Sequence, residues 1–269
     1  NSTLRAVTCS DPAYAAFLRE LQRDGFEAGW HNATWCTSGR EDTVRGLDLF
    51  NQTFGHDPVT MSNHASNREA IYWGAERLGG WRARAYRRMQ PMSFEGHVRE
   101  SPLFWGDVCS ERIRYVRNLT FPDLNTLNEC PFMPYHDPQR PLVKAWYASS
   151  DAGDDVSLWN RAVTEAAIDK LEAEGGACIA YTHFGKWFYQ HGSLDRRFRE
   201  VMAYLAGKNA WFPTVAELLD FLAQRRNGRV HQISADERAA MESRWLVQSF
   251  KLRIGHRGRE LASRPLGRI

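Results

Sequence analysis

Hydrophobic positions recur along the chain with two periods, one typical of helices and one typical of strands. Asp11 and Pro12 open a helical pattern that Gly25 ends. The positions expected to face the core of this helix are Tyr14, Phe17, Leu18 and Leu21. The stretch 25–32 then alternates apolar and polar residues in the manner of a strand and ends at His31.

Comparable signals predict further elements downstream. Helices are expected at 41–54, 68–78, within 158–174, from Asp195, from Thr214 and from Ser234, and a buried strand at 177–182. Thr214 with Glu217, and Ser234 with Glu237, have the spacing of capping boxes. Because strands and helices alternate, the pattern predicts an α/β protein with a largely parallel sheet or barrel. Active residues would then gather at the carboxyl ends of strands, where His31 and His183 lie.

Three segments define the expected organisation. Residues 1–223 form one α/β domain, in which 81–110 breaks the rhythm as an insertion that could shape a cleft. Residues 224–269 form a basic, helical C-terminal extension. Met241 and Trp245 share one face of its helix, which could dock on its own domain, on a second subunit or on a membrane surface. Docking on its own domain is the simplest expectation.

Composition narrows the functional classes. The apolar fraction of 43% and the charged fraction of 25% are those of a globular protein with a core. A net charge of +3, with the basic residues dispersed, argues against a nucleic-acid partner. The five cysteines are scattered, so neither a disulfide framework nor a zinc ribbon is expected. No apolar run is long enough to span a membrane. The compartment stays open: cytoplasmic, or secreted with a leader that this sequence lacks. The oligomeric state is open too.

Four stretches together resemble one family. GFEAGWHNATW resembles the G-H-E-I-G-N-H-T segment of polysaccharide deacetylases, the family of the NodB homology domain and carbohydrate esterase family 4. AWYASSDAG, around Asp151, is similar to its fourth motif, and GGACIAYTHF, ending near His183, to its fifth. WFPTVAELLDFL is similar to the closing strand and helix. The order and spacing match from about Leu4 to Leu222.

The resemblance implies a fold and a reaction. The fold would be a distorted (β/α) barrel of the polysaccharide deacetylase type. The reaction would be metal-dependent removal of N-acetyl groups from a polysaccharide or glycoconjugate. By similarity His31 would bind a divalent metal, zinc foremost with cobalt or nickel as alternatives, and His183 would be the general acid. Asp151 would hold and orient His183, as carboxylates orient imidazoles in hydrolytic triads.

The chain departs from the family pattern in its first three motifs. The T-F-D-D motif, which supplies the base and a metal ligand, is not found. Either the sequence is truncated ahead of it or the base is lost, and Asp11 fits a capping role better. Trp35 stands where the second histidine is usual, and Cys36 next to it could be a thiolate ligand or a small buried hydrophobe. His64, in place of the third motif's arginine, could be the missing ligand or a loop histidine.

Substrate contacts are expected from loop residues and aromatic side chains. Asn32, Tyr135, His136 and Trp187 are the candidates for binding a sugar. The loop around Tyr135 could instead be a plain turn, and Trp187 could close the barrel. Trp105 in the insertion is ambiguous in the same way. Two alternatives to the deacetylase remain: a sugar-binding pseudoenzyme, and an amidohydrolase of a small non-glycan amide.

Overall fold

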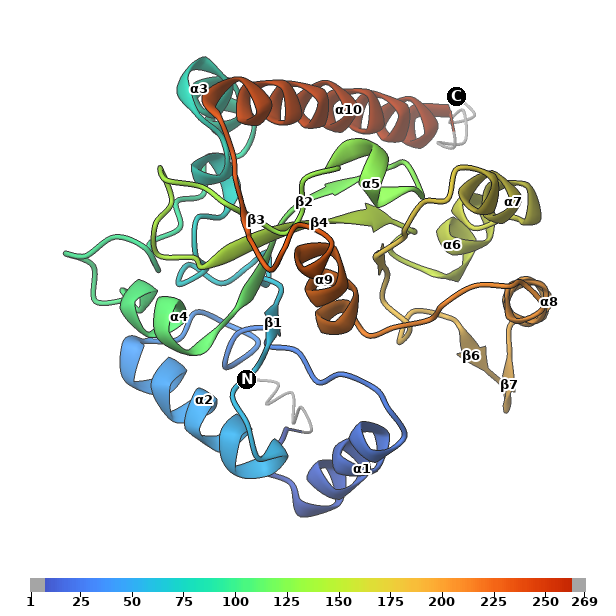
Figure 1. Cartoon of the computed structure of the whole chain (residues 1–269), viewed down its shortest axis with the longest axis horizontal. Coiled ribbons are helices and arrows are strands. Elements are labelled where there is room, and N and C mark those ends of the chain that lie inside the picture. The colour runs from blue at the N-terminus through green and yellow to red at the C-terminus, as the bar shows by residue number, and fades with distance from the viewer. Residues whose placement is uncertain (1–7, 263–269) are drawn as a thin grey trace, which may run out of the picture.

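The computed structural model describes residues 8–262, with side chains described through residue 250, as a mixed α/β structure around a mostly parallel sheet (Figure 1). The strands of the sheet, in chain order, are β1 (Thr60–Met61), β2 (Tyr115–Phe121), β3 (Tyr135–His136), β4 (Ala145–Asp151), β5 (Ala180–Tyr181) and β8 (His231–Gln232). Two further strands, β6 (Tyr189–Gln190) and β7 (Ser193–Leu194), form a hairpin outside it.

The parallel part of the sheet runs β1, β2, β4, β5. In register, Thr60 lies opposite Tyr115, Tyr115 opposite Ala145, and Ser150 opposite Ala180. Trp30 extends this row with a parallel bridge to Met61. β3 runs antiparallel to β4 and pairs in turn with β8. The predicted parallel sheet is therefore confirmed for the described residues, and its carboxyl edge collects the chain just after Trp30, β1, β2, β4 and β5.

Ten helices and one 3-10 turn surround the sheet in the described part of the chain. They are α1 (Pro12–Arg23), α2 (Arg40–Phe54), η1 (Gly74–Arg77), α3 (Gly80–Met89), α4 (Gly106–Arg112), α5 (Thr126–Glu129), α6 (Val156–Ala162), α7 (Glu165–Ala173), α8 (Arg196–Ala206), α9 (Val215–Gln224) and α10 (Ala235–Ala262). β2 and β4 are buried along nearly their whole length, because helices and loops cover both faces of the sheet.

Capping signals predicted helix starts correctly. Asp11 accepts the backbone N–H groups of Ala13 and Tyr14, and Thr214 with Glu217 forms a complete capping box. Gly55 ends α2 in the left-handed conformation, at φ 80°. Burial on α1 was predicted less well, since Phe17 is 52% exposed. The expected strand at 25–32 is reduced to the bridge at Trp30.

The predicted helix at 68–78 is wrong, and only the short turn η1 forms there. Glu69 is fully buried, and Asn63 and Ile71 exchange hydrogen bonds that hold the segment as a loop. Tyr72 has a φ of 44° and Gly74 one of 63°, which no right-handed helix contains. Side-chain hydrogen bonds to the backbone have displaced the helical ladder here.

The C-terminal helix docks on its own domain. Met241, Trp245 and Leu246 of α10 belong to the same hydrophobic core as the sheet, and α10 lies alongside α3 (Figure 1). Trp105, within the expected insertion at 81–110, is completely buried. It donates its indole N–H to the Glu69 carbonyl at 2.6 Å. Trp105 is thus a core residue, not a sugar platform.

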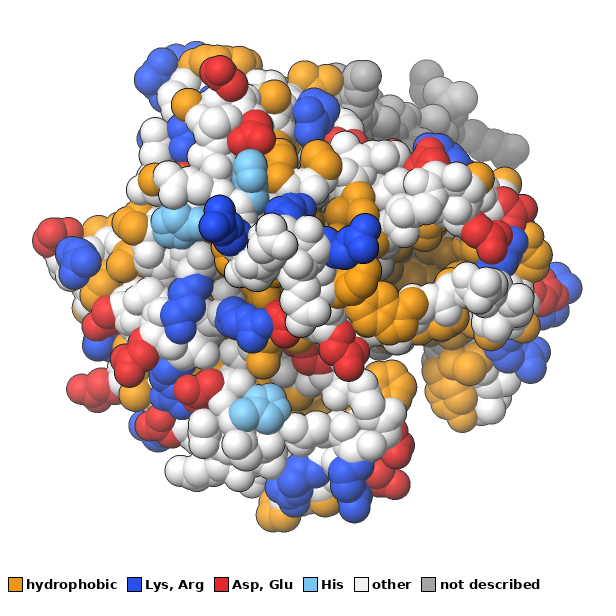
Figure 2. All heavy atoms as spheres, in the orientation of Figure 1, with side chains coloured by type: hydrophobic (Ala, Val, Ile, Leu, Met, Phe, Trp, Pro, Cys, Tyr) orange, Lys and Arg blue, Asp and Glu red, His pale blue; other side chains and the backbone are white. Residues whose placement is uncertain are grey.

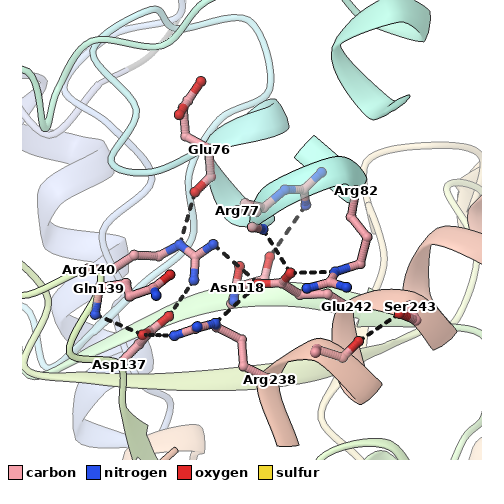
Figure 3. Close-up of polar contacts among 12 residues, drawn as sticks. Glu76, Arg77, Arg82, Asn118, Asp137, Gln139, Arg140, Arg238, Glu242 and Ser243 are labelled. Atoms are coloured by element: carbon pink, nitrogen blue, oxygen red, sulfur yellow. Dashed lines mark hydrogen bonds and ion pairs between the residues drawn. The ribbon is translucent and has the colours of Figure 1, made fainter. Parts of the chain in front are cut away.

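A network of buried charges attaches α10 to α3 and to the turn after β3 (Figure 3). Glu242 is fully buried and accepts from Gly79 N–H at 2.8 Å and from Arg82 Nε at 2.9 Å. Arg140 pairs with both Asp137 and Glu242. Arg238 joins Asp137 at 2.9 Å. The charges pair almost entirely with one another, which is how ionised groups persist in a protein interior.

Charged side chains on the visible face are mixed in sign. In Figure 2, Lys and Arg side chains alternate with Asp and Glu, and no continuous basic patch is seen on that face. No helix within residues 8–262 is long and apolar enough to cross a membrane.

Candidate functional site

His31 lies at the carboxyl edge of the sheet, directly after the Trp30 bridge. Trp30 N–H donates to the Thr60 carbonyl and Ser62 N–H to the Trp30 carbonyl, both at 2.9 Å. These bonds fix the backbone on both sides of β1. The His31 ring then reaches the Ser62 carbonyl through Nδ1 at 2.7 Å. Because a carbonyl only accepts, Nδ1 carries the proton and Nε2 presents a lone pair.

His64 stands beside His31, their ring centroids 5.2 Å apart. Its Nδ1 lies 2.7 Å from Asn67 Oδ1. The Asn67 amide nitrogen already donates to the carbonyls of Thr34 and Cys36, which identifies Oδ1 as the acceptor. His64 therefore also carries its proton on Nδ1 and leaves Nε2 bare. An imidazole whose Nδ1–H is held by an acceptor, with Nε2 free, is the form that ligates a metal.

A buried carboxylate holds this pair in place. Glu69 accepts from the side-chain amides of Asn32 at 3.0 Å and Asn67 at 2.7 Å, and from Ser38 N–H at 3.2 Å. Asn32 in turn accepts His64 N–H at 2.7 Å. Asn32 has a φ of 65°, in the left-handed region that asparagine tolerates better than most residues. Glu69 and Asn67 thus position His64, and neither was identified from the sequence.

The Asn32 side chain is held by hydrogen bonds to Glu69 and His64. It was predicted to contact substrate, but its amide oxygen and nitrogen are both engaged within the loop. Asn32 therefore acts as a positioning residue for His64. Asn67 is completely buried, so it too belongs to the support of the loop.

His183 follows β5 at the same edge. Its Nδ1 lies 2.5 Å from Asp154 Oδ1, an ion-pair contact without the alignment of a hydrogen bond. The Tyr181 hydroxyl lies 3.4 Å from His183 Nε2. Lys186 contacts the other Asp154 oxygen at 2.5 Å. The carboxylate beside His183 is therefore Asp154.

Asp151 was predicted to orient His183, but its carboxylate bonds the turn after β4. Its Oδ1 accepts Gly153 N–H at 3.0 Å and so shapes the turn after β4. Gly153 has a φ of 95°, and a Cβ there would lie 2.4 Å from Leu158 Cβ. Only glycine fits this turn, and the turn delivers Asp154, three residues beyond the strand end, to the imidazole.

Tyr135 and His136, predicted to contact substrate, lie in β3 beside the first half of β4. Tyr135 pairs with Trp146 in the first half of β4, is 1% exposed, and its hydroxyl accepts Asn118 Nδ2 at 2.9 Å. His136 Nδ1 lies 3.3 Å from the Lys144 carbonyl. The two residues support the sheet. Trp187, by contrast, is 64% exposed in the segment after His183 and stays a candidate for sugar contact.

The surroundings of His31 favour its neutral form. Burial lowers the pKa of His31 below its ordinary value, and the charges of His64, Arg117 and His183 lower this pKa further. The hydrogen bond to Ser62 acts in the opposite direction. Neutral imidazole is the ligating form, so this environment favours metal binding by His31 near neutral pH.

The fit of a metal to these side chains is partial. His31 and His64 offer two Nε2 lone pairs, but no group of three or more His, Cys, Asp or Glu within the described residues could hold a metal ion. Cys36 is an exposed free thiol in the same loop. A hollow of about 400 Å³ elsewhere on the surface, lined by Asp123, Lys170 and Glu174 among others, contains none of the predicted site residues.

Comparison with known proteins adds no relative: no protein-family model matches the chain, and no curated protein or solved structure is detectably similar to it. What the chain does must therefore be argued from the residues gathered at the carboxyl edge of its own sheet.

Proposed function

We propose that the chain is a metal-dependent hydrolase that removes N-acetyl groups from a polysaccharide or glycoconjugate. The observation that carries the proposal is the pair His31 and His64, whose Nδ1 atoms are held by acceptors and whose Nε2 atoms are free. Amide hydrolysis also needs a proton donor for the leaving amine, and His183, paired with Asp154 at the same edge, would be that donor. The resemblance of the sequence to polysaccharide deacetylases, which implies a (β/α) barrel, supports the same function.

Each residue has a definite role in this proposal. His31 and His64 would hold a divalent metal, zinc foremost, which when bound supplies Lewis acidity and an activated water. His183 protonates the leaving amine, the role of a general acid. Asp154 contacts His183 Nδ1 and positions its ring. Asp154 also contacts Lys186, which restrains the carboxylate from its other side.

Exposed aromatic side chains near the histidines favour a sugar substrate. The Trp35 ring lies 5.4 Å from the His64 ring and its residue is 76% exposed. Phe184 and Trp187, on the segment after His183, are 60% and 64% exposed. Aromatic faces exposed beside a polar site are what the apolar faces of sugar rings stack on. Their exposure suits an open groove for a polymer better than a closed pocket for a small amide.

Release of acetate from N-acetylated chitooligosaccharides, with zinc supplied, tests the proposal. His183→Gln is expected to lower the rate by about 10²–10⁴-fold, the usual contribution of general acid–base catalysis. His191→Gln is the matched control, since His191 is exposed on the same segment, and it should retain the rate. Absence of acetate release from every N-acetyl substrate, with metal bound, would refute the hydrolase.

A second function, sugar binding without hydrolysis, is favoured by one observation. Only His31 and His64 would be available as a ligand pair, since the described residues contain no group of three or more His, Cys, Asp or Glu that could hold a metal ion. In that case oligosaccharide would bind, Trp35→Ala would weaken the binding, and no acetate would appear. The same titration and acetate assay therefore separate the two functions.

A further inference from the structure

Arg117 is a buried cation that has no hydrogen-bond or ion-pair partner among the described side chains. It lies in the middle of β2 and is 7% exposed. No hydrogen bond or ion pair involves its guanidinium within residues 8–250, and its Nε–H is buried without an acceptor. The Tyr181 ring centroid lies 4.3 Å from the guanidinium carbon. A ring face attracts the charge but accepts none of the N–H donors in the plane of the guanidinium.

Other buried arginines show how this chain satisfies such groups. Arg77 lies between the rings of Trp73 and Trp245, and also donates to the carbonyls of Gly74 and Asn118 (Figure 3 shows it beside Asn118). Arg140 is paired with two carboxylates. Arginine stays charged at neutral pH, so burying it unpaired is unfavourable. The contrast indicates that the partner of Arg117 is not part of the described chain.

The position of Arg117 relates it to the histidine site. A bulge between Arg117 and Thr120 interrupts the pairing of β2 with β4, and bulges redirect side chains near functional sites. The next side chain, Asn118, serves the other face of the sheet by bonding Tyr135. Arg117 therefore faces the side occupied by Tyr181, and its charge acts on His31.

The acids near this side are already engaged. Asp154 pairs with His183 and Lys186, and Asp151 accepts Gly153 N–H. Glu69 serves three donors in the loop beneath His64. Among the described side chains, none of these carboxylates forms an ion pair with Arg117, so its guanidinium is left without a paired anion. An anion is the ligand that such an arrangement lacks.

We propose that Arg117 binds an oxyanion carried by the substrate, a carboxylate or phosphate group, beside His31 and His183. A guanidinium offers parallel N–H donors that match the two oxygens of such a group. The substrate would then be an acidic glycan or glycoconjugate. The identity of that natural ligand rests on the proposed function, whereas the anion site itself does not.

Titration of the metal-free full chain with inorganic phosphate and with acetate, by calorimetry at low ionic strength, tests the site. Arg117→Met should weaken binding of the preferred anion by about tenfold or more, because hydrogen bonds to a charged group are lost. Arg114→Met is the matched control: Arg114 precedes the same strand but is exposed and paired with Asp220, and its loss should leave affinity within about twofold. Preference for acetate or for phosphate identifies the oxyanion.

Thermal unfolding separates binding from a structural role. Without ligand, Arg117→Met should melt at or above the temperature of the parent, since an unpaired buried charge is removed. Phosphate or acetate should raise the melting temperature of the parent and not of the variant. If Arg117→Met fails to fold, Arg117→Lys serves instead, with affinity reduced because one ammonium replaces the planar fork.

Either of two results would overturn the anion site: no binding of phosphate or acetate by the parent, or equal affinity in the parent and the Arg117 variants. Neither result bears on acetate release or metal content, so the anion site and the hydrolase can fail separately.

Discussion

Replacement of Glu242 by glutamine should destabilise the protein strongly while changing its shape little. Glu242 is fully buried, and its two oxygens have separate partners. One accepts Gly79 N–H and Arg82 Nε, and the other faces Arg140 at 3.3 Å and Arg238 at 3.9 Å. Glu242→Gln keeps an oxygen that accepts from Gly79 and Arg82, but it turns an amide NH₂ toward Arg140 and Arg238.

The expected loss of unfolding free energy follows from the arginines that lose a carboxylate partner. Asp137 becomes the only carboxylate among Arg82, Arg140 and Arg238 in this network, whose side chains are 14%, 5% and 11% exposed. Removing one partner from a buried ion pair typically costs about 3–5 kcal/mol, because the other charge stays uncompensated. Since the amide keeps the hydrogen bonds to Gly79 and Arg82, we expect the lower end, about 3 kcal/mol.

Urea unfolding followed by circular dichroism measures this difference. A loss of about 3 kcal/mol lowers the midpoint by about 1 M or more at typical urea dependences. Glu200→Gln is the control: Glu200 pairs with Arg196 at 3.2 Å, but both side chains are largely exposed, so its loss should cost less than about 1 kcal/mol. A Glu242→Gln midpoint equal to that of the control would refute the view that this network holds α10 to α3 and to the turn after β3.

Two further predictions concern single carboxylates. Asp154→Asn should lower acetate release far more than Asp151→Asn, because Asp154 and not Asp151 contacts His183; equal losses would contradict this assignment. Asp57 has a pKa held below its ordinary value of 3.8 by hydrogen bonds from Arg112, so it stabilises the fold above that pH and the contribution is lost as pH falls through its folded pKa. Asp57→Asn should therefore be less stable than the parent near neutral pH, with the gap closing below about pH 3.8 in urea titrations; a gap independent of pH would refute the linkage.

Local signals in the sequence predicted local structure well. Asp11, Thr214 and Ser234 mark helix starts because a capping side chain bonds backbone only two or three residues away. The alternation of strands and helices likewise predicted a parallel sheet whose carboxyl edge brings His31 and His183 together. These inferences depend on spacing within one element or on a general rule of sheet topology.

Features set by distant contacts could not be read from the sequence. Glu69 looked like part of a helix, but its carboxylate bonds Asn32 and Ser38, more than thirty residues earlier. Asp151 ended a strand as expected, yet the tight turn at Gly153 passes its role to Asp154. Nothing in the sequence around Arg117 indicated that its side chain would be buried without a paired anion. Each depends on geometry that only the folded chain defines.

The metal content of the purified full chain, measured by elemental analysis after incubation with zinc and removal of the excess, tests the central claim most directly. His31→Ala and His64→Ala are compared with the parent, with His191→Ala as the exposed control and Cys36→Ser to show whether the thiol contributes. We predict about one equivalent of zinc in the parent and in His191→Ala, and a sharp loss in both His31→Ala and His64→Ala. A parent that binds no zinc, cobalt or nickel, or zinc that persists in both of those variants, would contradict a metal held by His31 and His64.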